Sequence, residues 1–282
     1  MKKPAMPSSA FIFYVFTILL SVEVSAQGPR QRVRDQLEER YVLPIRRDFD
    51  IDGLDRSALV FIPKDAGRRP LPVVLCFHGS GGNAQKAAGQ FSIHKHWSEA
   101  IVIYLNGLPR EVRGDVKPGW VLEIDEQGNN REIAFVEGLL KEIGNEVEIN
   151  EQAVFAAGHS NGGFLCYLLW QQRSDLFAAF APCACFSRVN LEGVPPKPIF
   201  HAAGRKDPLV PIAKQIETIE KVKEINEVGD GIKGKRPGMQ RFPSENGMPV
   251  VTFLHPRGHE YPEELGAMVS RFFEDIANRS GN

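Results

Sequence analysis

Residues 153–170, AVFAAGHSNGGFLCYLLW, decide the fold of this chain. The stretch begins with five apolar residues, as in a buried parallel strand, and residues 164–170 are apolar without proline, which predicts a helix. Between them, GHSNG at 158–162 matches G-x-S-x-G, in which the glycines leave room for a serine on a sharp strand-to-helix turn. The pattern therefore predicts a nucleophile at Ser160. The alternative is a glycine-rich turn with an unreactive serine.

Strands and helices alternate along most of the chain. Apolar runs predict strands at 71–77, 101–105, 198–202 and 250–254, and helical patterns occur at 83–100, 132–143, 212–228 and 263–276. Two alternating segments around Asp52 and Gly53 predict an antiparallel hairpin ahead of them. Residues 106–130 and 229–248 have no period and are predicted to be irregular insertions. The alternation predicts an α/β fold, with a mostly parallel sheet covered by helices on both faces.

Residues 1–26 are predicted to form a secretory signal peptide that is cleaved after Ala26. The segment has a basic start at Lys2 and Lys3, a mostly apolar run at 11–22, and the small-x-small ending VSA. This apolar run is short for a spanning helix, which needs about 20 residues, so an uncleaved membrane anchor is the less favoured alternative. We therefore expect a secreted or periplasmic protein with no stable membrane association after cleavage.

Residues 27–282 are predicted to fold as one domain, because they can bury one core and show no repeat or linker. The chain carries 34 Lys and Arg against 35 Asp and Glu, which gives no electrostatic reason to expect a nucleic-acid partner. The cysteines show no C-x-x-C spacing, so we expect no metal site from them. Core packing is the expected role of Cys76 and Cys166. The state of Cys183 and Cys185 stays open.

Three residues at predicted strand ends have the chemistry of acyl transfer. Ser160, Asp207 and His259 occur in the order nucleophile, acid, base that accompanies the G-x-S-x-G turn. A serine hydroxyl needs an imidazole to take its proton, and the imidazole needs a carboxylate to fix its tautomer. His255 is the alternative base, but it precedes a proline at a strand end and is interpreted as structural. Asp207 could also cap a helix that begins at Pro208.

Such a mechanism also needs two N–H donors for the oxyanion. The backbone amides of Asn161, directly after the nucleophile, and of Ser80, in the loop HGSGG at 78–82, are the candidates. An ordinary strand-to-helix turn is the alternative interpretation of this loop. No lysine follows in the register of a phosphate-binding loop, so a nucleotide is not expected.

With these residues placed, the chain resembles the secreted α/β-hydrolase esterases related to extracellular polyhydroxybutyrate depolymerases and to feruloyl or acetylxylan esterases. The resemblance rests on five segments: GLDRS at 53–57, HGSGGN at 78–83, GHSNGG at 158–163, GRKDPLVP at 204–211 and GHEYP at 258–262. It implies an α/β-hydrolase fold with an N-terminal antiparallel hairpin, and Ser160, Asp207 and His259 as nucleophile, acid and base. Two features depart from the family pattern: HAAG at 201–204, and Tyr261 where many relatives carry tryptophan.

We therefore expect a serine ester hydrolase that works through an acyl-enzyme and needs no metal or organic cofactor. Its substrates are expected to be soluble short-chain, acetyl or hydroxycinnamoyl esters, either small molecules or esters linked to a polysaccharide. A polyhydroxybutyrate depolymerase is an alternative, but we find no adsorption module after the closing helix. The same triad could serve a serine peptidase or an acyltransferase, and the same fold could serve a non-catalytic binding protein. Trp120 and Tyr261 are predicted to contact substrate, with a core anchor as the alternative for Trp120.

Overall fold

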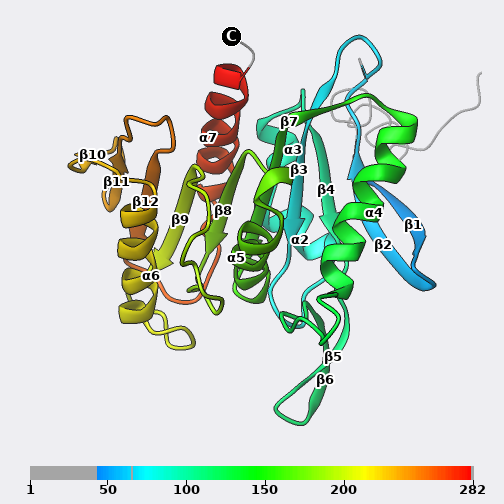
Figure 1. The fold of residues 1–282 in the computed structure, drawn as a ribbon, viewed down its shortest axis with the longest axis horizontal. Helices are drawn as coiled ribbons and strands as arrows, with labels where there is room; N and C mark the ends of the chain where they lie inside the picture. The colour runs from blue at the N-terminus through cyan, green and yellow to red at the C-terminus, as the bar shows by residue number, and fades with distance from the viewer. Residues whose placement is uncertain (1–42, 65, 281–282) are drawn as a thin grey trace, which may run out of the picture. The chain divides into compact units, whose positions relative to one another are not determined.

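The computed structural model describes residues 43–64 and 66–280. These residues fold around one ten-stranded sheet (Figure 1). These residues belong to one unit, Tyr41–Asn282. The predicted signal peptide, residues 1–26, lies outside the described residues. Within them, no helix is both long enough and apolar enough to cross a membrane.

The strands lie in the order β1-β2-β4-β3-β7-β8-β9-β12-β11-β10. Their bounds are β1 (Ile45–Ile51), β2 (Leu54–Phe61), β3 (Leu71–Phe77), β4 (Ile101–Leu105), β7 (Ile149–His159), β8 (Ala179–Cys183), β9 (Ile199–Gly204), β10 (Ile232–Lys233), β11 (Met239–Phe242) and β12 (Val250–His255). From β4 to β12 all neighbours in this order pair in parallel. Antiparallel strands flank them on both sides, and β1 and β2 form the predicted N-terminal hairpin. The predicted α/β architecture is confirmed.

Helices cover both faces of the sheet. They are α2 (Ala84–Phe91), α3 (Ile93–His96), α4 (Arg131–Glu146), α5 (Asn161–Arg173), α6 (Ile212–Ile225) and α7 (Leu265–Ser280), with a 3-10 turn at η1 (Ser174–Leu176). In Figure 1, α4, α5 and α6 lie in front of the sheet, and their apolar side chains share one core cluster. Side chains of α2, α3 and α7 form the cluster on the other face. Because β3 and β4 are buried at every residue, their continuous apolar runs fit the central strands of a covered sheet.

Four features differ from the sequence-based expectations. The helix predicted over 83–100 is two helices, because Ser92 takes a left-handed conformation with φ of 50°. Strand β8 was not predicted. The insertion 106–130 contains a separate two-stranded hairpin, β5 (Leu108–Val112) with β6 (Asp115–Gly119). The second insertion, 229–248, contains β10 and β11, which extend the main sheet beyond β12.

All four cysteines are buried and free. The core roles predicted for Cys76 and Cys166 are confirmed, and Cys183 and Cys185 also lie in the core. Burial raises the pKa of the Cys183 thiol, so this side chain stays neutral and unreactive at neutral pH.

Candidate active site

The predicted catalytic side chains follow three strands of the parallel part of the sheet, β7, β9 and β12. Ser160 comes directly after β7, Asp207 three residues after β9, and His259 four residues after β12. Because β9 pairs in parallel with both β8 and β12, and β8 with β7, the carboxyl ends of these strands lie at one edge of the sheet. Ligands of α/β proteins bind at this carboxyl end of the sheet.

Ser160 lies on a strained turn between β7 and α5. Its φ is 52° and its ψ is −114°, a region that residues other than glycine rarely occupy. The amide of Ser160 donates to the carbonyl of Cys183 (2.8 Å), and its own carbonyl accepts from Phe164 (3.0 Å) at the first turn of the helix. These bonds hold the backbone of the strained residue from both sides, and they fix the position from which its side chain projects.

Glycines at 158 and 162 permit the close packing of this turn. A Cβ on Gly158 would lie 2.7 Å from the amide nitrogen of Gly163 and closer still to the carbonyl of Gly162. A Cβ on Gly162 would lie 2.8 Å from the carbonyl oxygen of His78. All these neighbours are backbone atoms, which cannot rotate away, so the structure supplies the reason for both glycines in G-x-S-x-G.

A chain of hydrogen bonds joins the three side chains. Nε2 of His259 lies 2.9 Å from Oγ of Ser160, and its Nδ1 lies 2.8 Å from Oδ2 of Asp207. The imidazole is 13% exposed, whereas the carboxylate is fully buried. A carboxylate at Nδ1 favours the tautomer that carries its proton there, which leaves Nε2 free to accept a proton from the serine.

The carboxylate of Asp207 is held by further donors. Its Oδ1 accepts from the backbone amides of Leu209 and Val210, both at 2.8 Å, and Nε2 of Gln215 lies 3.3 Å from Oδ2. Burial raises the pKa of Asp207, but the bonds from Val210 and His259 lower it by more, so the net pKa is below its usual value. Asp207 closes a turn rather than capping a helix, since α6 begins only at Ile212.

The loop after β3 packs against the nucleophile. A Cβ on Gly79 would lie 3.5 Å from Cβ of Ser160, so the backbone of this loop is in contact with the elbow. Ser80 is exposed on the same loop. Asn161 is the first residue of α5, where backbone N–H groups lack intrahelical acceptors. The two residues predicted to supply amides therefore lie on adjoining segments beside Ser160.

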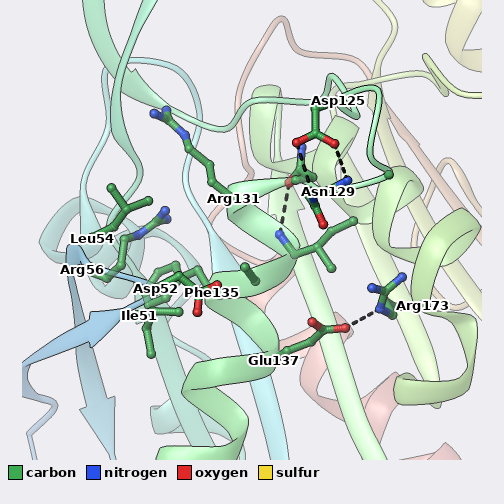
Figure 2. A pocket seen from close by; sticks show the side chains of 14 residues that line it. Ile51, Asp52, Leu54, Arg56, Asp125, Asn129, Arg131, Phe135, Glu137 and Arg173 are labelled. Atoms are coloured by element: carbon green, nitrogen blue, oxygen red, sulfur yellow. Dashed lines mark hydrogen bonds and ion pairs between the residues drawn. The ribbon is translucent and has the colours of Figure 1, made fainter.

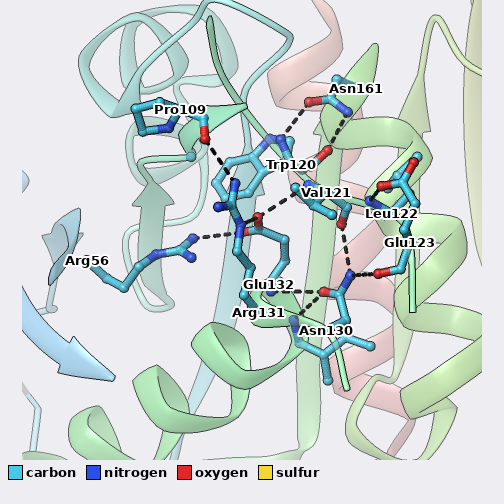
Figure 3. A network of polar contacts seen from close by, with 12 residues as sticks. Arg56, Pro109, Trp120, Val121, Leu122, Glu123, Asn130, Arg131, Glu132 and Asn161 are labelled. Atoms are coloured by element: carbon cyan, nitrogen blue, oxygen red, sulfur yellow. Dashed lines mark hydrogen bonds and ion pairs between the residues drawn. The ribbon is translucent and has the colours of Figure 1, made fainter. Parts of the chain in front are cut away.

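Asn161 has a second role that the sequence did not indicate. Its side-chain amide makes a reciprocal pair with the backbone of Trp120: Trp120 N donates to Oδ1 (2.7 Å), and Nδ2 donates to the Trp120 carbonyl (3.0 Å) (Figure 3). The Trp120 indole in turn donates to the carbonyl of His78 (2.7 Å). The segment after β6 thus connects the start of α5 to the loop that carries Ser80.

A buried ion pair between Arg56 and Glu132 holds the segment that follows Trp120. Glu132, at the start of α4, accepts from Arg56 (2.7 Å) and from the amide of Val121 (3.3 Å) (Figure 3). Asn130 caps α4 and also binds the carbonyl groups of Val121 and Glu123. Side chains from β2 and α4 therefore fix the segment that contacts Asn161.

The structure corrects the predicted substrate contacts. Trp120 is 1% exposed and packs edge-on against Phe77 with ring centroids 5.3 Å apart, so its ring is a core anchor. Tyr261 is 5% exposed and packs against Phe91 at 4.3 Å. Neither ring is open to a substrate, because both are covered by the elements on which they pack.

Two other histidines lie near the site. His255 is fully buried, and its ring lies tilted against Phe253 with 5.7 Å between the ring centroids, while His259 makes the bonds to Ser160 and Asp207. His159, which sequence reasoning passed over, lies 5.1 Å from the His259 ring. Burial, with a smaller contribution from His259, lowers the pKa of His159 to about 3, so its imidazole stays neutral beside the proposed base.

A cavity of about 310 Å³ lies near the start of α4, away from these residues (Figure 2). Several of its charged side chains already have protein partners: Asp125 binds Asn129, Arg173 binds Glu137, and Arg56 binds Glu132. None of Ser160, Asp207 and His259 lines it. In the described ranges, no group of three or more His, Cys, Asp or Glu side chains is arranged to hold a metal ion.

Comparisons with known proteins agree with this architecture. No protein-family model matches the chain. Similar solved structures include a carboxylesterase from Bacillus cereus (19% identical, TM-score 0.57, covering 78% of this chain and 94% of that one) and an acetyl xylan esterase from Aspergillus awamori (13%, 0.60, 82% and 99%). A third is the feruloyl esterase module from Clostridium thermocellum complexed with sinapinate (11%, 0.57, 82% and 86%). These likenesses show that the chain has the α/β-hydrolase fold.

One curated protein is similar in sequence. A bifunctional acetylxylan esterase/xylanase from Neocallimastix patriciarum is 27% identical over 161 residues, which make up 55% of this chain. The match spans only 22% of that protein's length. The resemblance to esterases noted in the sequence therefore has counterparts among both sequences and structures.

Proposed function

We propose that this protein is a serine carboxylic-ester hydrolase that works through an acyl-enzyme. The observation that carries the proposal is the hydrogen-bond chain from Oγ of Ser160 through His259 to Asp207, at the edge of the sheet where ligands bind. The esterases among the similar structures and the acetylxylan esterase match support the same reaction class.

In the proposed mechanism, Oγ of Ser160 attacks the ester carbonyl while its proton passes to Nε2 of His259. The carboxylate of Asp207 stabilises the imidazolium that forms. The amides of Asn161 and Ser80 donate to the developing oxyanion, which is where such donors have their largest effect. His259 then gives its proton to the departing alcohol, and the acyl group stays on Ser160. Water, activated by the same imidazole, hydrolyses this acyl-enzyme and restores the serine.

As substrates we propose soluble short-chain acetyl or hydroxycinnamoyl esters, free or linked to a polysaccharide. Named relatives support this class, since they include an acetyl xylan esterase and a feruloyl esterase module. Because Trp120 is buried, its ring does not stack on the substrate in this proposal. We also keep the proposal that residues 1–26 direct export.

The proposed function is tested with purified mature protein on p-nitrophenyl acetate, methyl ferulate, acetylated xylan, a p-nitroanilide and polyhydroxybutyrate granules. We expect turnover of the acetyl and feruloyl esters, and loss of that turnover by at least about a thousandfold in Ser160→Ala. Rapid cleavage of the anilide or clearing of granules without ester turnover would contradict the proposed substrate class. Unchanged turnover by folded Ser160→Ala would contradict the mechanism.

A further inference from the structure

Arg110, on β5, places a cation next to the loop that carries Ser80. Its guanidinium Nη2 lies 3.5 Å from Oγ of Ser80, which is a long and weak hydrogen bond. Nε of Arg110 is buried and has no hydrogen-bond partner in the described parts of the chain. A buried donor without an acceptor costs stability, and proteins rarely keep one without a function that needs it.

Two contacts bring this guanidinium close to the nucleophile. A Cβ on Gly119 would lie 2.6 Å both from Nε of Arg110 and from Oδ1 of Asn161, so both side chains pack against Gly119. Asn161 directly follows Ser160, and the loop with Ser80 contacts Ser160 through Gly79. Arg110 therefore lies beside the side chains of both residues proposed to supply the oxyanion donors, Ser80 and Asn161.

The charges around Arg110 leave it available to an anion. Glu132 is already paired with Arg56 and with Arg131, and Glu123 is exposed. Neither carboxylate forms an ion pair with Arg110 among the described residues. Burial lowers the pKa of Arg110, and the negative charge of Glu123 only partly offsets this effect. The positive charge of Arg188 lowers the pKa further, by less than Glu123 raises it. An anionic group bound here would offset the remaining effect of burial.

Arg188 adds a second cation on the same side of the site. Its guanidinium lies over the ring of Phe164, 4.1 Å from the centroid, and Phe164 is in the first turn of α5 after Ser160. Arg188 is otherwise exposed, and the Phe164 ring restricts where its charge can lie. The site therefore has two cations beside it: Arg110, which is partly buried, and Arg188, which is exposed.

We propose that Arg110 recognises a carboxylate on the substrate, so that the enzyme prefers esters whose acyl or alcohol part carries a negative charge. This inference rests on the proposed esterase function and narrows its substrate class. Arg110 would bind the charge through the N–H groups of Nη1 and Nη2, since a planar guanidinium matches a carboxylate in geometry. Arg110 is thus a specificity-determining residue.

Two matched ester pairs test the proposal. Para-acetoxybenzoate and para-acetoxybenzamide differ in charge on the alcohol part, and monomethyl terephthalate and methyl para-carbamoylbenzoate differ in charge on the acyl part. For each pair, the ratio of kcat/KM for the charged ester to that for the neutral ester is measured after correction for spontaneous hydrolysis. We expect a ratio of about ten or more for at least one pair, as for a hydrogen-bonded charge pair that is partly exposed.

Arg110→Gln should lower that ratio about tenfold, mainly through KM, and Arg110→Lys should retain part of it. Arg113→Gln is the control, because it removes the same charge from the exposed tip of the same hairpin and should leave the ratio unchanged. Thermal unfolding checks that each variant is folded.

Each result decides a different claim. Turnover of the neutral esters with a ratio near one in the wild type would overturn the anion inference and leave the esterase function intact. A preference that Arg110→Gln preserves would overturn the role of Arg110. If folded wild-type protein turned over none of these esters nor p-nitrophenyl acetate, the proposed function would fail and this inference with it.

Discussion

Replacing Gly158 by alanine should destabilise the protein by about 3 kcal/mol, at the upper end of the usual range for overpacking. The added Cβ would lie 2.7 Å from the amide nitrogen of Gly163 and closer still to the carbonyl of Gly162, and ordinary contacts need well over 3 Å, as ~3.5–4.0 Å is optimal between carbon atoms. These atoms are backbone at the start of α5, so relief requires that β7 and α5 move apart. Such a movement would also displace Ser160 from His259.

Gly89→Ala is the matched control. Gly89 lies in α2, it is exposed, and no heavy atom would lie within 4 Å of an added Cβ. This variant should be neutral or up to about 1 kcal/mol more stable, because alanine favours a helix. Thermal unfolding should then show a midpoint about 6–12 °C lower for Gly158→Ala, while Gly89→Ala stays at or above the wild type. Equal midpoints, or full esterase activity in Gly158→Ala, would refute the steric account of the elbow.

Three further predictions follow from the site. His259→Ala should lower kcat by several orders of magnitude, whereas His255→Ala should mainly lower the midpoint of thermal unfolding. Steady-state kinetics and thermal unfolding distinguish these results. The reverse pattern would show that His255 is the base. Asn161→Ala removes both hydrogen bonds to the Trp120 backbone. It should lower the free energy of unfolding, measured in urea, by about 2 kcal/mol and lower kcat/KM about tenfold. Wild-type values of both would contradict the role of this pair. Burial lowers the pKa of His201 to about 4, and below about pH 6.5 the unfolded chain binds a proton there that the folded chain does not. As the pH falls from about 6.5 to about 4, His201 should therefore reduce the free energy of unfolding by about 1.4 kcal/mol per pH unit, and a slope that is no smaller in His201→Gln would contradict this.

The parallel core and the order of the site residues could be predicted from the sequence because their signals are local. The apolar run at 153–157 and the glycines at 158 and 162 express requirements of the elbow itself. The strands β3, β4 and β12 were likewise predictable as continuous apolar runs, since both of their faces are buried. The positions of Asp207 and His259 then followed from the strand ends.

Other features depend on tertiary structure and left little local signal. Strand β8, AFAPC, contains two alanines and a proline, residue types that are depleted in strands, so its sequence carries little strand signal. The β5–β6 hairpin turns at Arg113 and Gly114, both with positive φ, but arginine is unusual at such a position. Trp120 was interpreted as a substrate contact because a loop tryptophan cannot be assigned to core or surface from sequence alone.

The central claim is that Ser160 is the nucleophile, and stoichiometric labelling tests it most directly. The mature protein is treated with diethyl p-nitrophenyl phosphate, the released p-nitrophenol is counted, and the adduct is located by mass spectrometry of peptides. The account predicts about one p-nitrophenol per chain, a diethylphosphoryl group on Ser160, loss of esterase activity in proportion, and no labelling of Ser160→Ala. A label on another residue, or an active enzyme that the reagent leaves unmodified, would contradict it.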